Sequence, residues 1–355
     1  MTEIVHVIVL AGGSGARLWP LSRQDNPKYL GDFGHGRTLL AETLRRATAI
    51  TDRTRITIVT GRHHASRVRT VAHSEGISSI LVEPRPRGTA AAIAAATRLA
   101  GARDGSAVVV VLPADHDVGD LRAWTDSVGE AVATAERGGL VCLGVRPLAP
   151  LTAFGYINAP DASSPDAPRA ALAFVEKPDA ARATAFLHDG GYFWNTGISV
   201  WRCDSFAGLM RLHAPAVQHA VEAATTPGTD VLDAVEWPRA PYAAIESVLL
   251  EPAAAQGAVT LVPARFTWAD LGSWDVVASR GIAVSTRPRV HELDAHNCHV
   301  IDLVRQVGRR YALLGVDDLI LVDSGDVLLI THRNRAQDVR KLVEELRTRG
   351  WEDLL

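Results

Sequence analysis

Five apolar, β-branched runs alternate with segments of helical spacing over the first 145 residues, and this alternation limits the possible folds more than any other feature. The runs are "HVIVL" (6–10), "RITIVT" (55–60), "SILVEP" (79–84), "AVVVVLPAD" (107–115) and "LVCLGV" (140–145). Strands that alternate with helices form right-handed βαβ units around a mostly parallel sheet. The sequence therefore predicts an α/β fold, in which a ligand lies outside the carboxyl ends of the strands.

The pattern changes twice after residue 150. The Ser/Pro/Asp/Ala run 159–170 predicts a surface loop or hairpin tip in a region of irregular spacing. After about residue 285, short apolar runs such as "CHVIDL" and "LILVDSGDVLLITH" are separated by Asp/Gly turns and precede one amphipathic helix. We therefore expect a first domain over 1–284 and a small β-rich C-terminal domain over 285–355 that ends in a helix.

The overall composition disfavours several classes of function. The chain is 47% hydrophobic and 22% charged, with a formal net charge of −3, so nucleic acid is not expected as the main partner. Membrane association is not expected either, because no apolar stretch is long enough to span a bilayer and the N-terminal "MTEIVHVIVL" lacks the pattern of a signal peptide. The three cysteines lack CxxC spacing, which is typical of buried free thiols in a cytoplasmic protein.

The segment "LAGGSGARLWPLSRQDNPKYL" (10–30) directly follows the first predicted strand. A glycine-rich turn after a strand lets the backbone approach a phosphate closely. The segment lacks the third glycine of a dinucleotide fingerprint, which disfavours a dinucleotide-dependent oxidoreductase, and it also lacks the Gly-Lys-Ser/Thr of a P-loop. Taken alone, the turn is equally compatible with a tight strand-to-helix connection.

Lysine is rare in this chain, which makes each lysine informative. Of 37 basic residues only three are lysines. Lys341 lies in a polar helical segment and is interpreted as part of a solvated face, whereas Lys28 and Lys177 lie in the short motifs "NPKYL" and "FVEKPD". A compact ammonium group suits a single phosphate oxygen better than a planar guanidinium does. We therefore interpret Lys28 and Lys177 as candidate phosphate ligands.

These residue types suit the transfer of a nucleotidyl group between two phosphates. Such a site must neutralise dense negative charge with backbone N–H groups, cations and a metal. Arg17 is suited to clamp the terminal phosphates, Lys28 to reach the phosphorus under attack, and Lys177 to hold the attacking phosphate. Mg²⁺ is usually held by one or two carboxylates and substrate oxygens, and Asp115 and Asp270 are the best candidates.

Each of these residues also has a structural interpretation. Asp115 could cap the helix that follows it, "WADLGSWD" (268–275) could be an aromatic turn packed in the core, and Asn195 could satisfy a turn. Some histidines lack partners at metal-ligand spacing and are interpreted as structural: His63, His64 and His116.

Together, the motifs resemble the signature of sugar-1-phosphate nucleotidyltransferases, specifically of the mannose-1-phosphate guanylyltransferase branch, for which Trp19 in "RLWP" is typical. The resemblance extends over essentially the whole chain. Besides residues 10–30 it rests on "EPRPRGTAAAIAAA" (83–96), "LPADH" (112–116), "AFGYI" (153–157), "FVEKP" (174–178), "WNTGISVW" (194–201), "WADLGSWD" and the C-terminal "LLGVDDLILVDSGDVLLI".

The resemblance implies a Rossmann-like GTP site, with Mg²⁺ bound through Asp115 and Asp270. It implies three catalytic residues, Arg17 and Lys28 on the triphosphate and Lys177 on the phosphate of a hexose-like 1-phosphate. The oxygen of that phosphate would attack the α-phosphorus and release pyrophosphate without a general base. The other implied nucleotide ligands are Leu10, Gly12, Gly13, Gly15, Glu83, Arg87 and Thr89. The implied sugar ligands are Gly155, Glu176 and Asn195. A homodimer through the C-terminal strands is also implied.

The chain departs from the family pattern in three places. Relatives usually carry Arg-Asn-Thr where this chain has "RGT" (87–89), and Ser-Ile-Asp-Tyr followed by Glu-Lys where it has "AIES" (244–247) and "EP" (251–252). The resemblance places the latter region near the acceptor sugar. Two acceptors therefore stay open: mannose 1-phosphate, giving GDP-mannose, and a cyclitol 1-phosphate such as valienol 1-phosphate in antibiotic biosynthesis. The alternative from another class is a non-catalytic regulatory subunit that binds a nucleotide sugar, which has no need of the retained lysines and aspartates.

Overall fold

The computed structural model describes residues 4–13, 15–33, 36–160, 164–280, 289–304 and 309–355. The chain forms two compact units. The first consists of Met1–Ala11, Thr43–Pro113 and Val118–Trp268, and the second of Gly12–Glu42, Ala114–Asp117 and Ala269–Leu355. The domain boundary expected between residues 284 and 285 lies outside the described residues.

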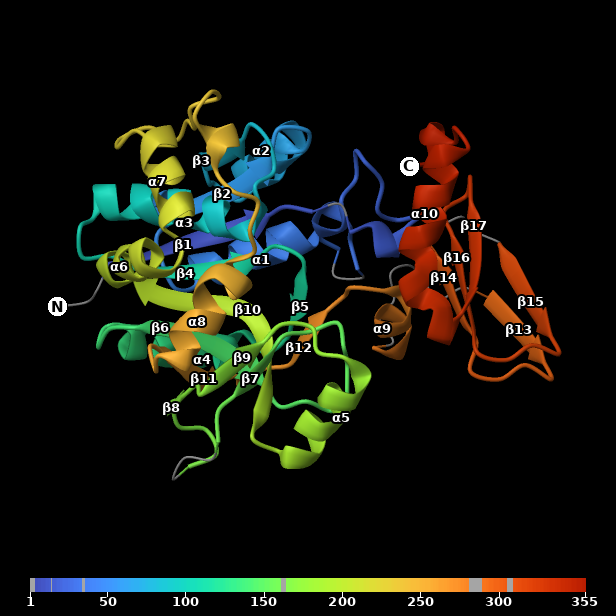
Figure 1. Cartoon of the computed structure of the whole chain (residues 1–355). Coiled ribbons are helices and arrows are strands. Elements are labelled where there is room, and N and C mark those ends of the chain that lie inside the picture. Colours follow the sequence, from blue (N-terminus) through green and yellow to red (C-terminus); the bar gives the residue numbers. More distant parts are fainter. Residues whose placement is uncertain (1–3, 14, 34–35, 161–163, 281–288, 305–308) are drawn as a thin grey trace. The chain divides into compact units, whose positions relative to one another are not determined.

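The elements of the first unit follow the predicted alternation of strands and helices (Figure 1). Its strands are β1 (Val5–Ala11), β2 (Ile56–Gly61), β3 (Ser79–Glu83), β4 (Val108–Pro113), β6 (Leu140–Val145), β7 (Tyr156–Asn158), β8 (Arg169–Ala170), β9 (Ala173–Val175), β10 (Tyr192–Arg202) and β11 (Val259–Pro263). Its helices are η3 (Arg53–Arg55), α2 (Ala65–Ser74), α3 (Gly88–Arg103), α4 (Leu121–Ala135), α5 (Ala180–Asp189), α6 (Cys203–His213), α7 (Pro215–Ala224), η4 (Trp237–Arg239), the π-helical turn η5 (Glu246–Leu250) and α8 (Glu251–Ala255).

Three elements span points where the chain passes between the units. They are α1 (Leu39–Thr48), β5 (His116–Val118) and β12 (Trp268–Asp270), and β5 pairs with β12 in a two-stranded sheet.

The large sheet has the strand order β3-β2-β1-β4-β10-β6-β11-β8. The pairs β2–β3, β1–β2, β1–β4 and β6–β11 are parallel, and β10 is antiparallel to β4, β6 and β7. The predicted α/β fold with a mostly parallel sheet is confirmed.

Burial explains why the sequences of the parallel strands are continuous apolar runs. All of Val108–Leu112 in β4 is buried, so both faces of this strand are covered, as is usual for parallel sheets. Ten of the 16 residues of α3 are buried. The small alanines of this helix let it contact the strands β1, β2 and β4 as well as the helices α6 and α7 (Figure 1).

The central strand β10 does not follow from the sequence pattern. Its segment "YFWNTGISVWR" combines aromatic and β-branched residues, which favour strands, with Asn-Thr-Gly, which indicates a turn. In the structure the turn residues form an irregularity, where the register with β6 shifts between Asn195 and Ser199 and Gly197 has φ +71°. The strand therefore continues through a bulge.

The run 159–170 is described only in part, because residues 161–163 lie outside the described residues. Its end forms β8, which pairs antiparallel with β11. Among the described residues no helix is both long and apolar enough to cross a membrane.

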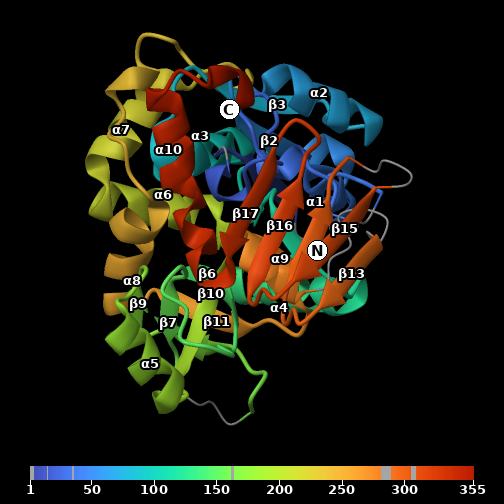
Figure 2. The same cartoon turned by 90° about the vertical axis from the view of Figure 1, so that its right-hand side faces the viewer.

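The second unit holds short strands and one long helix, shown in orange and red in Figure 2. Its strands are β13 (Arg289–Leu293), β14 (His299–Asp302), β15 (Arg310–Leu314), β16 (Leu319–Asp323) and β17 (Leu328–His332). Its helices are η1 (Ala16–Leu18), η2 (Lys28–Leu30), α9 (Trp274–Ser279), η6 (Arg333–Asp338), α10 (Val339–Thr348) and η7 (Glu352–Leu354). The pairs β13–β15 and β14–β16 are parallel, and β17 is antiparallel to β16. The predicted β-rich C-terminal region ending in a helix is confirmed.

The glycine-rich segment and the C-terminal strands of this unit share one hydrophobic core. Leu18 and Trp19 belong to the same cluster of buried side chains as Val322 and Val343. The indole Nε1 of Trp19 donates a hydrogen bond to the carbonyl oxygen of Leu354 at 2.8 Å.

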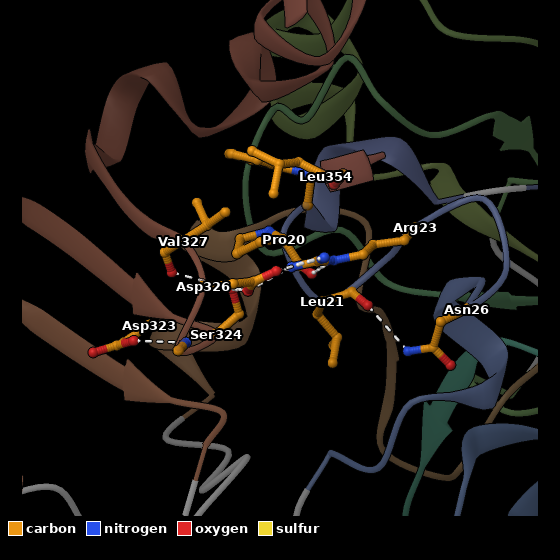
Figure 3. A network of polar contacts seen from close by, with 11 residues as sticks. Pro20, Leu21, Arg23, Asn26, Asp323, Ser324, Asp326, Val327 and Leu354 are labelled. Atoms are coloured by element: carbon orange, nitrogen blue, oxygen red, sulfur yellow. Dashed lines mark hydrogen bonds and ion pairs between the residues drawn. The ribbon is translucent and has the colours of Figure 1, made fainter. Parts of the chain in front are cut away.

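A polar contact at the edge of this core joins the same two parts of the chain. The Arg23 guanidinium pairs with the Asp326 carboxylate at 2.7 Å and also donates to the Pro20 carbonyl oxygen (Figure 3). Both apolar and polar contacts therefore join the segment that carries the glycine turn to the C-terminal strands.

Candidate active site

The glycine turn of the second unit depends on left-handed backbone. Gly13 and Gly15 have φ values of +85° and +66°, which residues with a Cβ rarely adopt. A Cβ on Gly15 would also lie 2.6 Å from the Cβ of Lys28. Gly15 therefore allows the turn to pack directly against the residue that carries the first of the two candidate lysines.

Lys28 joins the two aspartates that the sequence singles out. Its Nζ donates to Asp115 Oδ2 at 3.0 Å and to Asp270 Oδ1 at 2.7 Å. Asp115 lies two residues beyond β4, and Asp270 is the last residue of β12. Only 4% of Lys28 is exposed to solvent, so the two carboxylates converge on one buried cation.

The charges in this group reinforce one another. Burial alone would lower the pKa of Lys28, but the carboxylates of Asp115 and Asp270 outweigh burial and raise it above its ordinary value. Burial alone would raise the pKa of Asp270, but the positive charges of Lys28, His116 and Arg17 outweigh it and hold that pKa below its usual range. The aspartate is thus ionised throughout the neutral pH range.

Arg17, in η1, belongs to the same positive surroundings. Its Nη1 donates to Gln337 Oε1 at 2.8 Å, and Gln337 Nε2 donates to Ser273 Oγ at 2.9 Å. A Cβ on Gly272 would lie 3.2 Å from Asp270 Oδ2 and 3.4 Å from Arg17 Nη2, so a glycine here leaves room for both side chains. The sequence pattern gives no indication of Gln337, which belongs to no recognisable motif, and Ser273 lies in the motif "WADLGSWD" without being singled out there.

The sequence also allows a purely structural role for each of these residues, and the structure supports that role for some of them only. Asp115 does not cap α4, whose cap is Asp120, with its Oδ1 accepting from Ala123 N at 3.0 Å. Trp274 is fully buried in the core of the second unit, so the segment 268–275 is an aromatic-anchored turn that also carries Asp270. His116 is not isolated, since its Nε2 lies 3.8 Å from Asp115 Oδ1.

The predicted nucleotide ligands of the first unit lie at the carboxyl ends of its strands, as expected for this type of sheet. Leu10 pairs with Val59 and Pro113 near the end of β1, and Glu83 is the last residue of β3. Arg87 directly precedes α3, and Thr89 lies in its first turn.

Glu83 is electrostatically unusual. Burial raises its pKa to about 7, although its carboxylate accepts a hydrogen bond from the Arg87 backbone. Glu83 Oε1 and Arg87 Nε are both buried, and neither has a hydrogen-bond partner within the described part of the chain. Buried polar atoms without partners are rare and are often completed by a ligand or water.

The three predicted sugar ligands come together in the first unit. A Cβ on Gly155 would lie 2.7 Å from Glu176 Oε2, and Asn195 N donates to the Gly155 carbonyl oxygen at 2.8 Å. Asn195 Oδ1 also accepts from Gly197 N at 3.1 Å, so this side chain does stabilise a turn.

Lys177 is held next to this group by strained backbone. Its φ of +44° lies in the left-handed region, which a residue with a side chain rarely adopts. Its Nζ donates to Glu176 Oε1, and its side chain is 64% exposed. The Lys177 ammonium therefore pairs with Glu176 while its side chain stays accessible to a ligand.

Two further glutamates, Glu251 and Glu246, interact with Glu176. Glu251 Oε1 accepts a hydrogen bond from Glu176 N at 3.2 Å. Glu246 interacts electrostatically with Glu176 and Lys177, and its carboxylate forms a hydrogen bond with the Thr89 side chain. Burial is the main cause of the raised pKa of Glu246. In the sequence Glu246 stands out only as a departure from the family pattern, whereas Glu251 matches the glutamate usual in relatives and only the following Pro252 departs from it.

Comparisons with known proteins identify the family of this chain. The family described as Nucleotidyl transferase matches residues 6–280. The chain belongs to this nucleotidyltransferase family. A second family, described as MannoseP isomerase/GMP-like beta-helix domain, matches residues 289–346. The predicted resemblance is confirmed, and the chain is an enzyme of the guanylyltransferase type.

Individual relatives of this nucleotidyltransferase are similar over nearly its whole length. The alginate biosynthesis protein AlgA of Pseudomonas aeruginosa is 33% identical over 97% of this chain and 72% of the relative. The mannose-1-phosphate guanylyltransferase of Escherichia coli is 31% identical over 96% of this chain and 73% of the relative.

A solved structure extends the similarity to three dimensions. The Thermus thermophilus protein described as mannose-1-phosphate geranyltransferase has a TM-score of 0.83 and 32% identity, over 97% of this chain and 99% of that protein. The nucleotidyltransferase therefore shares its fold with a protein whose described substrate is mannose 1-phosphate.

Proposed function

We propose that this nucleotidyltransferase transfers GMP from GTP to mannose 1-phosphate, so that its products are GDP-mannose and pyrophosphate. Its similarity to proteins named mannose-1-phosphate guanylyltransferase supports both substrates. The observation that carries the reaction type is the convergence of Asp115 and Asp270 on the buried ammonium of Lys28. This convergence favours an enzyme over the non-catalytic binding subunit.

The donor set of Asp115 and Asp270 fits Mg²⁺. Both are hard oxygen donors, and both already lie within 3.0 Å of one cationic group. When bound, Mg²⁺ would neutralise charge on the phosphate oxygens. The fit rests on these two carboxylates and on substrate oxygens, because no cluster of three or more ligating side chains occurs among the residues that the structure describes.

In the proposed reaction this chain's own side chains bind and orient the substrates. Arg17 and Lys28 hold the triphosphate, and Lys177 holds the phosphate of the acceptor. An oxygen of that phosphate forms a bond to the α-phosphorus while the bond from the α-phosphorus to the bridging oxygen of pyrophosphate breaks. The attacking oxygen is already ionised, so no proton needs to be moved. Charge neutralisation and alignment supply the rate enhancement.

Glu83 is the residue that we propose to select guanine. An ionised carboxylate only accepts hydrogen bonds, and the N1–H and exocyclic N2–H₂ of guanine are adjacent donors that match its two oxygens. The corresponding edge of adenine lacks this pair of donors. The buried, unpartnered Oε1 of Glu83 supports this assignment.

Replacing Glu83 with glutamine is expected to reduce the preference for GTP over ATP about 10- to 100-fold, because the amide matches the guanine edge less well. Since burial raises the pKa of Glu83 to about 7, this carboxyl group is protonated below that pH. The KM for GTP should therefore rise about tenfold for each pH unit below 7 in the wild type. Steady-state assays with both nucleotides from pH 6 to pH 8 test this. A similar pH dependence in Glu83→Gln would exclude Glu83 as its origin.

A cyclitol 1-phosphate is the second candidate acceptor, because the chain departs from the family pattern in the region that the resemblance places near the acceptor sugar. A Cβ on Gly88 would lie 2.2 Å from the Ala243 carbonyl oxygen, so the asparagine usual in relatives does not fit this conformation. Ala90 N donates to the same oxygen at 3.1 Å, and Ile245 N donates to Thr89 Oγ1 at 2.9 Å. Hydrogen bonds therefore join the segments that carry two of the departures, and Glu246 in the second of these segments interacts electrostatically with Glu176.

The acceptor is tested by measuring pyrophosphate release with GTP, Mg²⁺ and a panel of 1-phosphates. We expect mannose 1-phosphate to give the highest kcat/KM among mannose, glucose, fucose and valienol 1-phosphates. A clear preference for valienol 1-phosphate would establish the second candidate instead. No release with any of them, while GTP still binds, would contradict the proposed reaction.

The remaining expectations about partners and location accompany this proposal. The substrates are GTP and a hexose-like 1-phosphate, which are available in the cytoplasm. Cys142 and Cys203 are buried free thiols, which suits a reducing compartment. A homodimer through the C-terminal strands stays a prediction from the resemblance.

A further inference from the structure

The guanidinium of Arg17 has a partner that lies far away in the sequence. Its Nη1 donates to Gln337 Oε1, 320 residues further along the chain, at 2.8 Å. Gln337 belongs to η6, which directly precedes the C-terminal helix α10. The family resemblance gives Gln337 no role.

Both ends of the Gln337 amide are used, so its orientation is defined. The oxygen accepts from Arg17, while the nitrogen donates to Ser273 Oγ at 2.9 Å. Ser273 is fully buried and follows Gly272, the residue that leaves room for the Asp270 and Arg17 side chains. The chain of contacts therefore connects Arg17 to the residues that directly follow Asp270 at the end of β12.

The backbone on each side of this contact is anchored in the same core. Ala336 and Val339 flank Gln337 and are buried in the cluster that also contains Leu18, the neighbour of Arg17. A guanidinium on a flexible side chain loses less conformational entropy on binding a ligand when a fixed acceptor already orients it.

We propose that Gln337 is a positioning residue for Arg17, through which the C-terminal part of the chain orients the triphosphate clamp. Gln337 holds one N–H group of Arg17 and leaves the others directed to phosphate oxygens. This inference rests on the proposed function for the identity of the ligand, the triphosphate of GTP. It implies that nucleotide affinity depends on a residue outside the nucleotidyltransferase motifs.

The test combines single and double variants. Gln337→Ala is expected to raise the KM and the Kd for GTP about tenfold, because a hydrogen bond to a charged group is lost. The KM for the acceptor should stay within about twofold, because Gln337 contacts Arg17 and Ser273 and none of the proposed acceptor ligands. In an Arg17→Ala background, Gln337→Ala should cause no further loss.

The controls separate positioning from general stability. Asn334→Ala removes an exposed side chain of the same helix, whose Oδ1 contacts His332 Nδ1 at 2.9 Å, and should leave GTP affinity unchanged. An equal loss from Gln337→Ala with and without Arg17 would overturn the proposal, as would an unchanged GTP affinity. Calorimetric GTP binding is measured alongside turnover. Binding without turnover in the wild type contradicts only the proposed reaction, whereas absence of GTP binding overturns both.

Discussion

Replacing Asp270 with asparagine is expected to lower the rate of pyrophosphate release about 10³-fold at saturating Mg²⁺. The amide keeps the shape of the side chain but removes the negative charge that, with Asp115, converges on Lys28. The charges around Asp270 hold its pKa below its usual range, so protonation does not weaken the wild-type site at neutral pH. The measurement is kcat for pyrophosphate release across a titration of Mg²⁺.

Asp326→Asn is the matched control for this variant. Asp326 is also an aspartate of the second unit with a lowered pKa, but its partner is Arg23 instead of Lys28. We expect its kcat to stay within about threefold of the wild type, because an exposed ion pair contributes little. A kcat near that of the wild type for Asp270→Asn would remove Asp270 from the proposed metal site.

Replacing Lys177 with alanine is expected to lower turnover about 10²- to 10³-fold while GTP binding persists. The Lys177 ammonium is exposed, is held by left-handed backbone and contacts Glu176, which lies beside Gly155, another of the proposed sugar ligands. Lys177→Arg should rescue only weakly, because the broader guanidinium does not reproduce a point charge. Turnover is measured by pyrophosphate release, and GTP affinity by calorimetry.

The chain supplies a control for Lys177 as well. Lys341 is also exposed, and its Nζ pairs with Asp338 Oδ1 at 2.7 Å on the surface of the second unit. Lys341→Ala should leave both turnover and GTP affinity unchanged. If Lys177→Ala instead abolished GTP binding, Lys177 would belong to the nucleotide half of the site.

Local patterns predict much of the fold but not its central antiparallel strand. The apolar runs of β1 to β4 are recognisable because every residue of a doubly covered strand can be apolar. The strand β10 is not recognisable in the sequence, because Asn-Thr-Gly usually indicates the end of a strand but here forms a bulge. Only the neighbours β4 and β6, on either side of it, show that the strand continues.

Local sequence patterns likewise predict only part of the candidate site. Glycine turns, rare lysines and strand-terminal carboxylates stand out locally, and they point to Lys28, Asp115 and Asp270 individually. Their mutual contact depends on residues 87 and 242 positions apart, which no local pattern encodes. Gln337 and Glu251 could not be predicted, because a single glutamine or glutamate becomes informative only when its hydrogen-bond partner is known.

The core shared by residues 12–42 and the C-terminal strands has a consequence for how such enzymes can be recombined. A chimaera that takes only the C-terminal region of a relative would join foreign side chains to Leu18, Trp19 and Arg23, which pack against or pair with that region here. Tightly packed cores tolerate such mismatches poorly. The smallest segment set that can be exchanged between relatives is therefore discontinuous in sequence. It has to include the glycine turn together with the C-terminal strands that contact it.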